Sequence, residues 1–532
     1  MKFFKTLLLT LFALTSLHTT AQEAKVGAGL DPASIVHPAP DSWPTYNGDY
    51  SGRRFSPLTQ INDKNVKSLS LAWLYQMPNL GEGMVRRLAG TPIVLNGVIY
   101  ITTADHAWAL DARTSKELWH FMWTTKGGIH LGNRGAAVSG NTLYLETPDC
   151  NLVALNIADG TKRWSQSICD LDQMYYASVA PVVVKNHVII GVSGDDLDRP
   201  GYLEARDPET GELQWHWSVV PKPGEPGSET WPNADAMAHG GGMTWIPPTY
   251  DPELNLLYIG TGNPQPVLNA SSRAGANLFT ESIVALHADT GKMAWYFQPS
   301  PHDTHDWDAI QTPVLFDGMM DGKHHKLLAQ ASRNGRFFVL DRETGKNFVS
   351  TEFVKTNWVK GLDAKGQPIP DTAKEPQIPG VLVAPDASGG VNWEPPSFSP
   401  ATGLFYVNAT HSYSMFYIYD DTNRPEGWGG QQNGHWSEAI LEALDYRTGK
   451  IKWSHTWETP GSKGGLLSTA GNLLFTGDPN NNFIAMDATT GKSLWHVQLG
   501  TGLSNGAITY MLDGHQYVLI GAGDKLFAFV MN

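Results

Sequence analysis

The stretch Leu155–Trp164, LNIADGTKRW, contains the motif that decides the fold of this chain. It reads as an apolar strand that ends near an aspartate, a tight turn, and a second strand that carries a tryptophan. The turn usually contains Thr-Gly, and the copy Leu340–Val349 has valine where the tryptophan is expected. Six further copies of the motif follow one another along the chain: Leu110–Trp119, Arg206–Trp215, Leu286–Trp295, Leu340–Val349, Leu444–Trp453 and Met486–Trp495.

An eighth tryptophan strand, Leu71–Gln76, lacks its preceding half, and three apolar strand-like runs without such a partner lie at the other end of the chain, within residues 506–531. Successive tryptophans are as close as 42 residues, from Trp453 to Trp495 (495 − 453), which accommodates four short strands. The pattern therefore predicts an all-β, eight-bladed β-propeller with tryptophan-docking repeats, closed by its N-terminal strand. Separate β domains are the alternative, but no linker divides the chain.

The composition supports many short strands and excludes one class of partner. Among 532 residues there are 54 glycines and 34 prolines, which are residues that end strands and form turns. The formal net charge of −14 argues against nucleic-acid binding, which requires a basic surface. An anionic cofactor would have to meet locally placed arginines or lysines.

The N-terminus has the pattern of a signal peptide. Lys2 and Lys5 precede the apolar run Leu7–Leu17, and small residues at 19–21 offer a cleavage site. We expect residues 1–21 to be removed and residues 22–532 to form one propeller domain that is periplasmic or secreted. The apolar run is too short to predict stable membrane insertion.

The chain contains two cysteines, Cys150 and Cys169, and no CxxCH haem-attachment sequence. The Asp159-Gly160 turn lies midway between them, so a hairpin about this turn would bring both cysteines to the same rung. Export makes oxidation possible, which favours a disulfide over two buried free thiols.

The segment Pro301–Asp308, PHDTHDWD, is the most unusual part of the sequence, because it places three aspartates and two histidines in eight residues. Such a density of acceptors requires a cation or hydrogen-bond donors if it is buried. A solvated loop and a metal site with a carboxylate base are both consistent with it. Segments that interrupt the repeats, and that we expect to form loops around a site, are Pro264–Leu278, Thr351–Gly389 and Tyr419–Trp436.

Several motifs occur in an order that resembles a known family. They are WPTYNGDYSGRRFSPLTQIN (43–62), GNRGAAV (132–138), GGGMTW (240–245), TGNPQP (261–266), PHDTHDWD (301–308), ASRNG (331–335) and VNWEPPSFSP (391–400). From about Trp43 to Phe529 the chain resembles the pyrroloquinoline quinone (PQQ)-dependent alcohol dehydrogenases, in a divergent branch without a cytochrome domain. The resemblance implies an eight-bladed propeller with PQQ and a calcium or lanthanide ion on the ring axis.

The resemblance also implies roles for single residues. Asp306 falls at the catalytic base and Arg333 at the arginine beside the quinone oxygens. Trp245 falls at the tryptophan that stacks on PQQ. The cofactor-binding positions are Arg134, Ser178, Ser193, Gly194, Trp245 and Asn392, and the metal-ligating positions are Asp196, Asn263, Asp306 and Asp308.

Some positions depart from the usual family pattern. Asp196 stands where a glutamate ligand is usual, and Ala89, Met243 and Lys463 replace residues that line the cofactor site. Asp308 resembles the second aspartate of lanthanide-dependent relatives, and an added carboxylate suits a more highly charged cation. The sequence therefore leaves open whether the site binds calcium or a lanthanide.

The sequence predicts an exported dehydrogenase that oxidises an alcohol by hydride transfer to metal-bound PQQ, with Asp306 as the base. Without a haem motif, the electrons would pass to a separate acceptor, a soluble cytochrome. The alternative is a non-catalytic propeller of the same architecture that serves as a binding or assembly scaffold. The retained acidic residues favour the enzyme, and Ala89 favours the scaffold.

Overall fold

The fold is almost entirely β-structure, as expected for a propeller. The computed structural model describes residues 27, 29–78, 88–128, 132–194, 198–419, 427–461 and 464–531, so the predicted signal peptide and its cleavage site lie outside the described residues. In the described ranges the one α-helix is α1 (Ala234–Ala238), and no helix there is long and apolar enough to cross a membrane. The 3₁₀ turns are η1 (Pro32–Val36), η2 (Val66–Ser68), η3 (Leu171–Gln173), η4 (Ser228–Thr230), η5 (Ala270–Ser272) and η6 (Thr372–Lys374).

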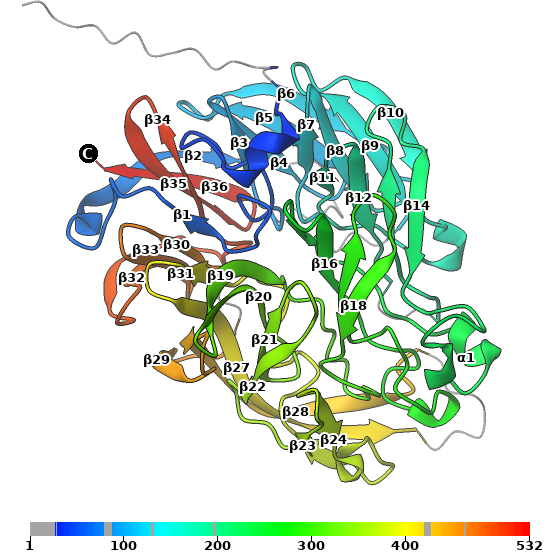
Figure 1. Cartoon of the computed structure of the whole chain (residues 1–532). Coiled ribbons are helices and arrows are strands. Elements are labelled where there is room, and N and C mark those ends of the chain that lie inside the picture. Colours follow the sequence, from blue (N-terminus) through cyan, green and yellow to red (C-terminus); the bar gives the residue numbers. More distant parts are fainter. Residues whose placement is uncertain are drawn as a thin grey trace, which may run out of the picture.

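The described strands form eight antiparallel blades that follow one another along the chain (Figure 1). Each copy of the repeat motif joins the third and fourth strands of a blade. The first five blades comprise β3 (Ile93–Leu95), β4 (Val98–Thr102), β5 (His106–Asp111), β6 (Glu117–Met122); β7 (Ala137–Ser139), β8 (Thr142–Thr147), β9 (Asn151–Asn156), β10 (Lys162–Ser167); β11 (Val182–Val184), β12 (His187–Gly191), β13 (Tyr202–Arg206), β14 (Leu213–Ser218); β15 (Thr249–Asp251), β16 (Leu256–Gly260), β17 (Ile283–His287), β18 (Met293–Phe297); and β19 (Val314–Met320), β20 (Lys323–Ala331), β21 (Arg336–Asp341), β22 (Asn347–Glu352).

Two of the last three blades recruit a strand from the N-terminal segment. Strand β1 adds to one blade in parallel with β30, and β2 pairs antiparallel with β36, so the N-terminal segment joins the C-terminal one as expected. The strands are β26 (Ser397–Ser399), β27 (Leu404–Ile418), β28 (Gly430–Asp445), β29 (Ile451–Thr456) with β25 (Val381–Val383); β1 (Phe55–Ser56), β30 (Leu467–Thr469), β31 (Leu473–Gly477), β32 (Asn482–Asp487), β33 (Ser493–Gln498); and β34 (Ile508–Leu512), β35 (His515–Ala522), β36 (Lys525–Met531), β2 (Leu69–Gln76).

Tryptophans of the repeat dock blades onto the blades that follow them. The indole N–H of Trp119 donates to the carbonyl of Ile157 at 3.0 Å, and Trp215 makes the equivalent bond to Ala288 at 2.9 Å. The Trp119 ring lies against the turn at Gly160, where an added Cβ would be 2.6 Å from the ring. Gly160 has a φ of +71°, so both the backbone conformation and the space require glycine. This confirms the predicted docking role of the tryptophans.

The hydrophobic core lies between neighbouring blades rather than at one centre. Tyr144 and Leu152 of one blade pack with Val183 and Ile190 of the next. Tyr258 and Phe338 belong to another such layer between the fourth and fifth blades. Each blade buries both of its faces, which is why its inner strands are continuous apolar runs.

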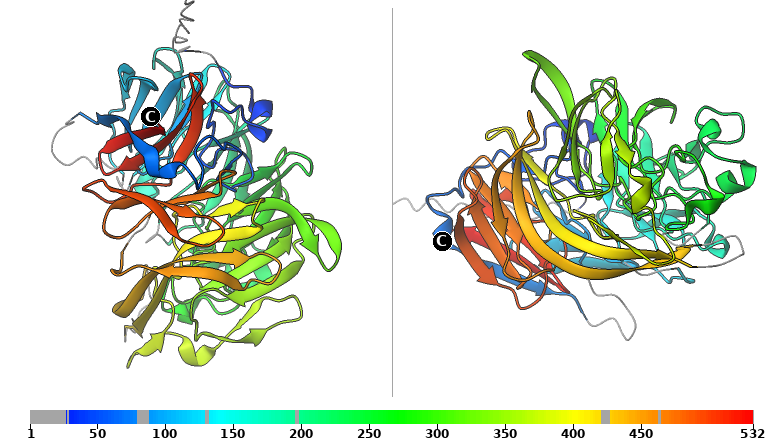
Figure 2. Two further views of the ribbon diagram at one scale, coloured as in Figure 1. Left: turned by 90° about the vertical axis from the view of Figure 1, so that its left-hand side faces the viewer. Right: turned by 90° about the horizontal axis from the view of Figure 1, so that it is seen from below.

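The interrupting segments differ from the expected loops in two cases. Segment 419–436 was expected to be a loop, but β28 already begins at Gly430 and pairs with β27 back to Ile418. The two strands form a long hairpin that extends well past the rest of its blade (Figure 2). The Gln- and Asn-rich sequence conceals this strand, because its side chains are exposed and show no apolar alternation. Segment 351–389 contains the small hairpin β23 (Val359–Leu362) and β24 (Pro368–Pro370).

The predicted disulfide is present. Strands β9 and β10 pair about the Asp159-Gly160 turn, and the backbone N–H of Ile168 donates to the carbonyl of Cys150. Cys150 and Cys169 are bonded, with their Cα atoms 5.0 Å apart. Cys150 belongs to the same apolar cluster as Trp245 and Met243, so the crosslink supports the layer that holds Trp245.

Candidate active site

The predicted site residues lie in loops at one end of the blades. Arg134, Ser178, Trp245, Asp306 and Asn392 precede the innermost strands of successive blades. Ser193, Gly194, Asn263 and Arg333 follow second strands. Because the first two strands of a blade are antiparallel, the start of one and the end of the other lie at the same edge. The sequence therefore places all nine residues on one face of the ring.

Arg333 is the centre of the acidic part of the site. Its Nη2 donates to Oδ2 of Asp306 at 2.8 Å, and its Nη1 donates to Oδ2 of Asp308 at 2.8 Å. The Arg333 side chain is 6% exposed, and Nη2 also donates to the carbonyl of Ala387. One guanidinium thus joins the two aspartates with charge-assisted hydrogen bonds, which are the stronger kind.

Asp308 connects this acidic part to two further predicted residues. Its Oδ1 accepts from the backbone N–H of Asn263 at 2.6 Å, and its Oδ2 accepts from the indole N–H of Trp245 at 3.0 Å. Burial raises the pKa of Asp308, while the charge of Arg333 opposes that rise. The carboxylate is therefore held in place from three directions.

The cofactor-binding positions form a second group beside the first. The guanidinium of Arg134 lies over the Trp245 ring, 4.6 Å from its centroid, and 5.7 Å from the ring of Trp393. Nη1 of Arg134 donates to Oγ of Ser178 at 2.7 Å, and that hydroxyl is 2.9 Å from Oγ of Ser193. Trp245 belongs to both groups, since its ring faces Arg134 and its N–H faces Asp308.

Two predicted positions are less well connected, and a third lies outside the described residues. Gly194 follows Ser193 and is buried. Asn392 hydrogen-bonds within its own loop, to the carbonyl of Ser388 and the N–H of Trp393. Asp196 lies outside the described residues, and so does Lys463.

The positions that depart from the family pattern are filled by compact packing where they are described. Ala89 is 8% exposed, and its carbonyl accepts from the side chain of Asn505 at 2.8 Å. Met243 is 4% exposed and packs with Trp245 and Cys150. Both replacements are therefore buried and place an apolar side chain where the family pattern has a different residue.

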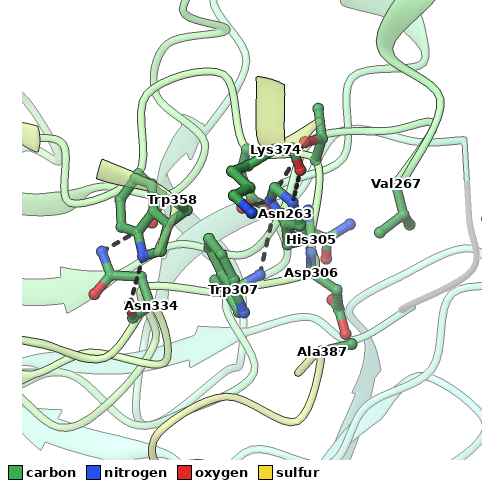
Figure 3. A network of polar contacts seen from close by, with 12 residues as sticks. Asn263, Val267, His305, Asp306, Trp307, Asn334, Trp358, Lys374 and Ala387 are labelled. Atoms are coloured by element: carbon green, nitrogen blue, oxygen red, sulfur yellow. Dashed lines mark hydrogen bonds and ion pairs between the residues drawn. The ribbon is translucent and has the colours of Figure 1, made fainter. Parts of the chain in front are cut away.

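The loop that carries Asp306 is supported by residues behind it (Figure 3). The His305 ring stacks on Trp307 with centroids 4.3 Å apart, and its Nε2 is 2.9 Å from the carbonyl of Lys374. Burial lowers the pKa of His305 to about 4, so the ring is neutral. The indole N–H of Trp307 donates to the carbonyl of Asp386 at 2.9 Å. The histidine is therefore a packing and hydrogen-bonding group in this structure.

Two buried residues near the site were missed in the sequence. Arg273 is fully buried in the segment 264–278, and burial lowers its pKa to about 10. Glu281 is also fully buried, and neither of its carboxyl oxygens has a hydrogen-bond partner among the described residues. Burial raises the pKa of Glu281 well above its usual range, and Asp303 and Asp308 raise it further. Neither residue lies in a recognisable motif, so only the three-dimensional arrangement identifies them.

The described residues fit the groups that the resemblance implies. Asp306, Asp308 and the amide of Asn263 supply hard oxygen donors, which suit calcium or a lanthanide. Arg134 and the two serine hydroxyls, beside the flat ring of Trp245, suit a planar anionic group. Within the described ranges, no group of three or more His, Cys, Asp or Glu side chains is arranged to hold a metal ion. The proposed donor set would instead combine two carboxylates with an asparagine, and Asp196 lies outside those ranges.

Comparison with known proteins supports the same assignment. Residues 43–379 and 455–518 match the family model described as "PQQ: Glucose/ethanol/alcohol dehydrogenase, beta-propeller domain". The chain is 36% identical over 508 residues to the quinoprotein alcohol dehydrogenase PedH of Pseudomonas putida KT2440, covering 89% of this chain and 84% of that protein. It is 36% identical over 520 residues to a quinohemoprotein alcohol dehydrogenase of Comamonas testosteroni, covering 90% and 72%.

Solved structures agree with the sequence comparison. The crystal structure of the Comamonas testosteroni quinohemoprotein alcohol dehydrogenase superimposes with a TM-score of 0.88 at 32% identity, over 96% of this chain and 83% of that one. A europium-containing methanol dehydrogenase superimposes with a TM-score of 0.85 at 28% identity, over 93% and 99%. On these grounds the chain belongs to the PQQ-dependent glucose, ethanol and alcohol dehydrogenase family of β-propeller proteins.

Proposed function

We propose that this chain is an exported dehydrogenase that oxidises an alcohol by hydride transfer to metal-bound PQQ, with Asp306 as the base. Membership of a family of PQQ-dependent alcohol dehydrogenases supports the enzyme class. One observation supports the residue assignment. The guanidinium of Arg333 donates to both Asp306 and Asp308. Asp308 in turn accepts from Trp245 and Asn263.

Each residue in this proposal has a stated task, and Asp306 has two. PQQ, when bound, supplies the electrophilic carbonyl that accepts the hydride. Arg134, Ser178 and Ser193 would hold its carboxylates while Trp245 supports its plane. Asp306, Asp308 and Asn263, with Asp196, would hold the cation. Arg333 offers guanidinium hydrogens to the oxygen on which negative charge develops.

Asp306 would remove the hydroxyl proton of the alcohol as the hydride leaves the neighbouring carbon. The alcohol thus loses one proton and one hydride and becomes a carbonyl compound. The Asp306 side chain is 17% exposed, which leaves it reachable from the face of the ring, whereas that of Asp308 is 4% exposed. This difference supports Asp306, rather than Asp308, as the residue that meets the substrate.

The electrons would pass to a separate acceptor, for which we propose a soluble cytochrome outside the cytoplasm. The two cysteines of this sequence are bonded to each other, so neither is available to attach a haem. Export would depend on residues 1–21. Sequencing the N-terminus of protein recovered from the periplasm would test this, because an uncleaved chain confined to the cytoplasm would contradict it.

Reconstitution tests the proposed activity. Purified protein would receive PQQ with Ca²⁺, or PQQ with a lanthanide, and dye reduction would be followed with a panel of alcohols. We expect activity with at least one metal, and a loss of about 10²-fold or more in Asp306→Asn, as for removal of a general base. Asp487→Asn, in a repeat turn, is the matched control and should keep its activity. If PQQ binds with neither metal, the scaffold alternative replaces the enzyme.

A further inference from the structure

Arg273 connects an inserted segment to the loop that carries Asp306. The arginine lies in segment 264–278 and is fully buried. Its Nε donates to the carbonyl of Pro266 and its Nη2 to that of Val267, both at 2.8 Å, while Nη1 donates to Oδ1 of Asn277 at 2.9 Å. Nη2 also donates to the backbone carbonyl of Asp303 at 2.7 Å. The guanidinium therefore organises its own segment and holds the first aspartate of the neighbouring loop.

Asp303 in turn organises the backbone around the base. Its Oδ2 accepts from the backbone N–H groups of His305 at 3.1 Å, Asp306 at 2.8 Å and Trp307 at 3.2 Å. The Asp303 side chain is 1% exposed, so these bonds are shielded from water. One carboxylate oxygen thus fixes three consecutive peptide groups.

The conformation of Asp306 needs such support. Its φ is +67°, in the left-handed region. For a residue with a Cβ, this conformation is about 1–2 kcal/mol less favourable than the right-handed one. Such conformations persist only where the surrounding structure determines them. The Asp306 carboxylate reaches Arg333 from this backbone conformation. A relaxed backbone would therefore move the carboxylate away from the site.

We propose that Arg273 is a positioning residue for Asp306: through Asp303, it lets the inserted segment 264–278 fix the backbone of the base. The role given to Asp306 rests on the proposed function, whereas the coupling between the two segments rests on the contacts alone. An arginine is required because its planar fork reaches several acceptors at once, and a lysine cannot reproduce that geometry.

The test compares two buried arginines. Arg273→Lys is the test variant, and Arg342→Lys is the matched control. Arg342 is 7% exposed and bonds to the carbonyl of Phe316 and the carboxylate of Asp251, in a repeat turn between blades. Amide hydrogen exchange would be measured in peptides that cover residues 301–308, in the full chain with PQQ and its metal bound. Steady-state kinetics would be measured on the same samples.

We expect Arg273→Lys to speed amide exchange in residues 301–308 by about tenfold or more, and to lower kcat by about 10–100-fold. KM and the bound amount of PQQ should change little, because Arg273 bonds to none of the residues proposed to bind PQQ itself, which are Arg134, Ser178, Ser193 and Trp245. Arg342→Lys should leave both the exchange of these amides and kcat unchanged. A purely structural effect would instead appear in both variants.

Unchanged exchange in residues 301–308 of a folded Arg273→Lys protein would overturn the proposal. If this variant does not fold, Asp303→Asn replaces it. This substitution keeps the shape of the side chain and weakens the three hydrogen bonds that Asp303 accepts from residues 305–307. Unchanged exchange in that variant would equally overturn the proposal. Because exchange is read without turnover, a failure of the proposed alcohol oxidation would be seen separately, as absent activity in the unsubstituted protein. Faster exchange with unaltered kcat would also contradict a positioning role.

Discussion

The repeat turns and the loop 301–308 share a local hydrogen-bonding pattern, in which an aspartate carboxylate accepts from the backbone N–H groups that follow it. In a repeat turn, Asp487 accepts from the backbone N–H groups of Thr489 at 2.9 Å and Thr490 at 2.8 Å. In the loop, Asp303 accepts from the residues two, three and four positions further on. Both aspartates bend the chain back on itself, and in both places a residue with positive φ follows.

The difference lies in which residue takes the left-handed conformation. In the turn it is Gly491, with a φ of +73°, and an added Cβ there would be 2.5 Å from the ring of Trp453. After Asp303 in the loop it is Asp306, a residue with a Cβ, for which this conformation is less favourable than for glycine. The turn requires glycine because a tryptophan ring fills the space beside it, whereas the left-handed residue of the loop has a carboxylate that accepts a hydrogen bond from Arg333. The repeat turns thus serve the docking of blades, and the proposed function assigns the loop 301–308 to chemistry.

The first expected effect is on activity and concerns the metal. If the loop serves chemistry, Asp308→Asn should lower lanthanide-dependent activity by about tenfold or more, because the site loses a negatively charged oxygen donor. Activity with Ca²⁺ should fall less. Dye reduction at saturating PQQ, titrated with each cation, measures both effects. Equal losses with the two metals would mean that Asp308 does not distinguish them.

The next effect concerns the fold. Gly160→Ala should lower the free energy of unfolding by about 3 kcal/mol, because it adds left-handed strain and a contact with the Trp119 ring. Gly140→Ala is the control, since Gly140 also has positive φ but has nothing within 4 Å of an added Cβ. That control should cost only about 1 kcal/mol. Urea denaturation measures both, and equal costs would show that the tryptophan contact contributes nothing.

The smallest effect is a difference in pH dependence. Hydrogen bonds from the hydroxyl and N–H of Thr161 lower the pKa of Asp159 below 3.8, so its stabilisation is present above that pH and is lost as the pH falls. Burial raises the pKa of Asp303, so its stabilisation is fully present below 3.8 and is lost as the pH rises through the raised pKa.

The two aspartates should therefore show opposite trends. The loss of unfolding free energy caused by Asp159→Asn should grow as the pH rises from acidic values, while the loss caused by Asp303→Asn should shrink. Urea midpoints of both variants and the unsubstituted chain, taken across acidic and neutral pH, measure the slopes. Slopes of the same sign would show that the two aspartates are not in contrasting environments.

Much of the fold could be predicted because its signals are local and repeated. The Asp-turn-Trp motif recurs in register with the third and fourth strands of seven blades, and the unmatched halves at the two ends correspond to the pairing of β2 with β36. The first half of β28 was missed, because its side chains are mostly exposed and show no apolar alternation. The parallel addition of β1 to β30 joins residues too far apart in sequence for any local pattern to reveal.

The candidate site was partly predictable for a similar reason. Motif order identified Asp306, Asp308, Arg333, Asn263 and Trp245, which the structure brings into one connected group. Arg273 and Glu281 carry no motif and depend on burial, so they could not be found in the sequence.

The sequence by itself determined the class of fold, the disulfide pairing and the family, because repeated turns, cysteine spacing and motif order are properties of the chain. Only the tertiary structure decided which buried groups act on one another. Arg273 meets the carbonyl of Asp303, and Asp303 meets the peptide groups around Asp306, because a loop within the fourth blade and the loop that leads into the fifth blade converge. Hydrogen bonds depend on distance and direction in space, and residues 30 positions apart acquire these only when the blades are assembled.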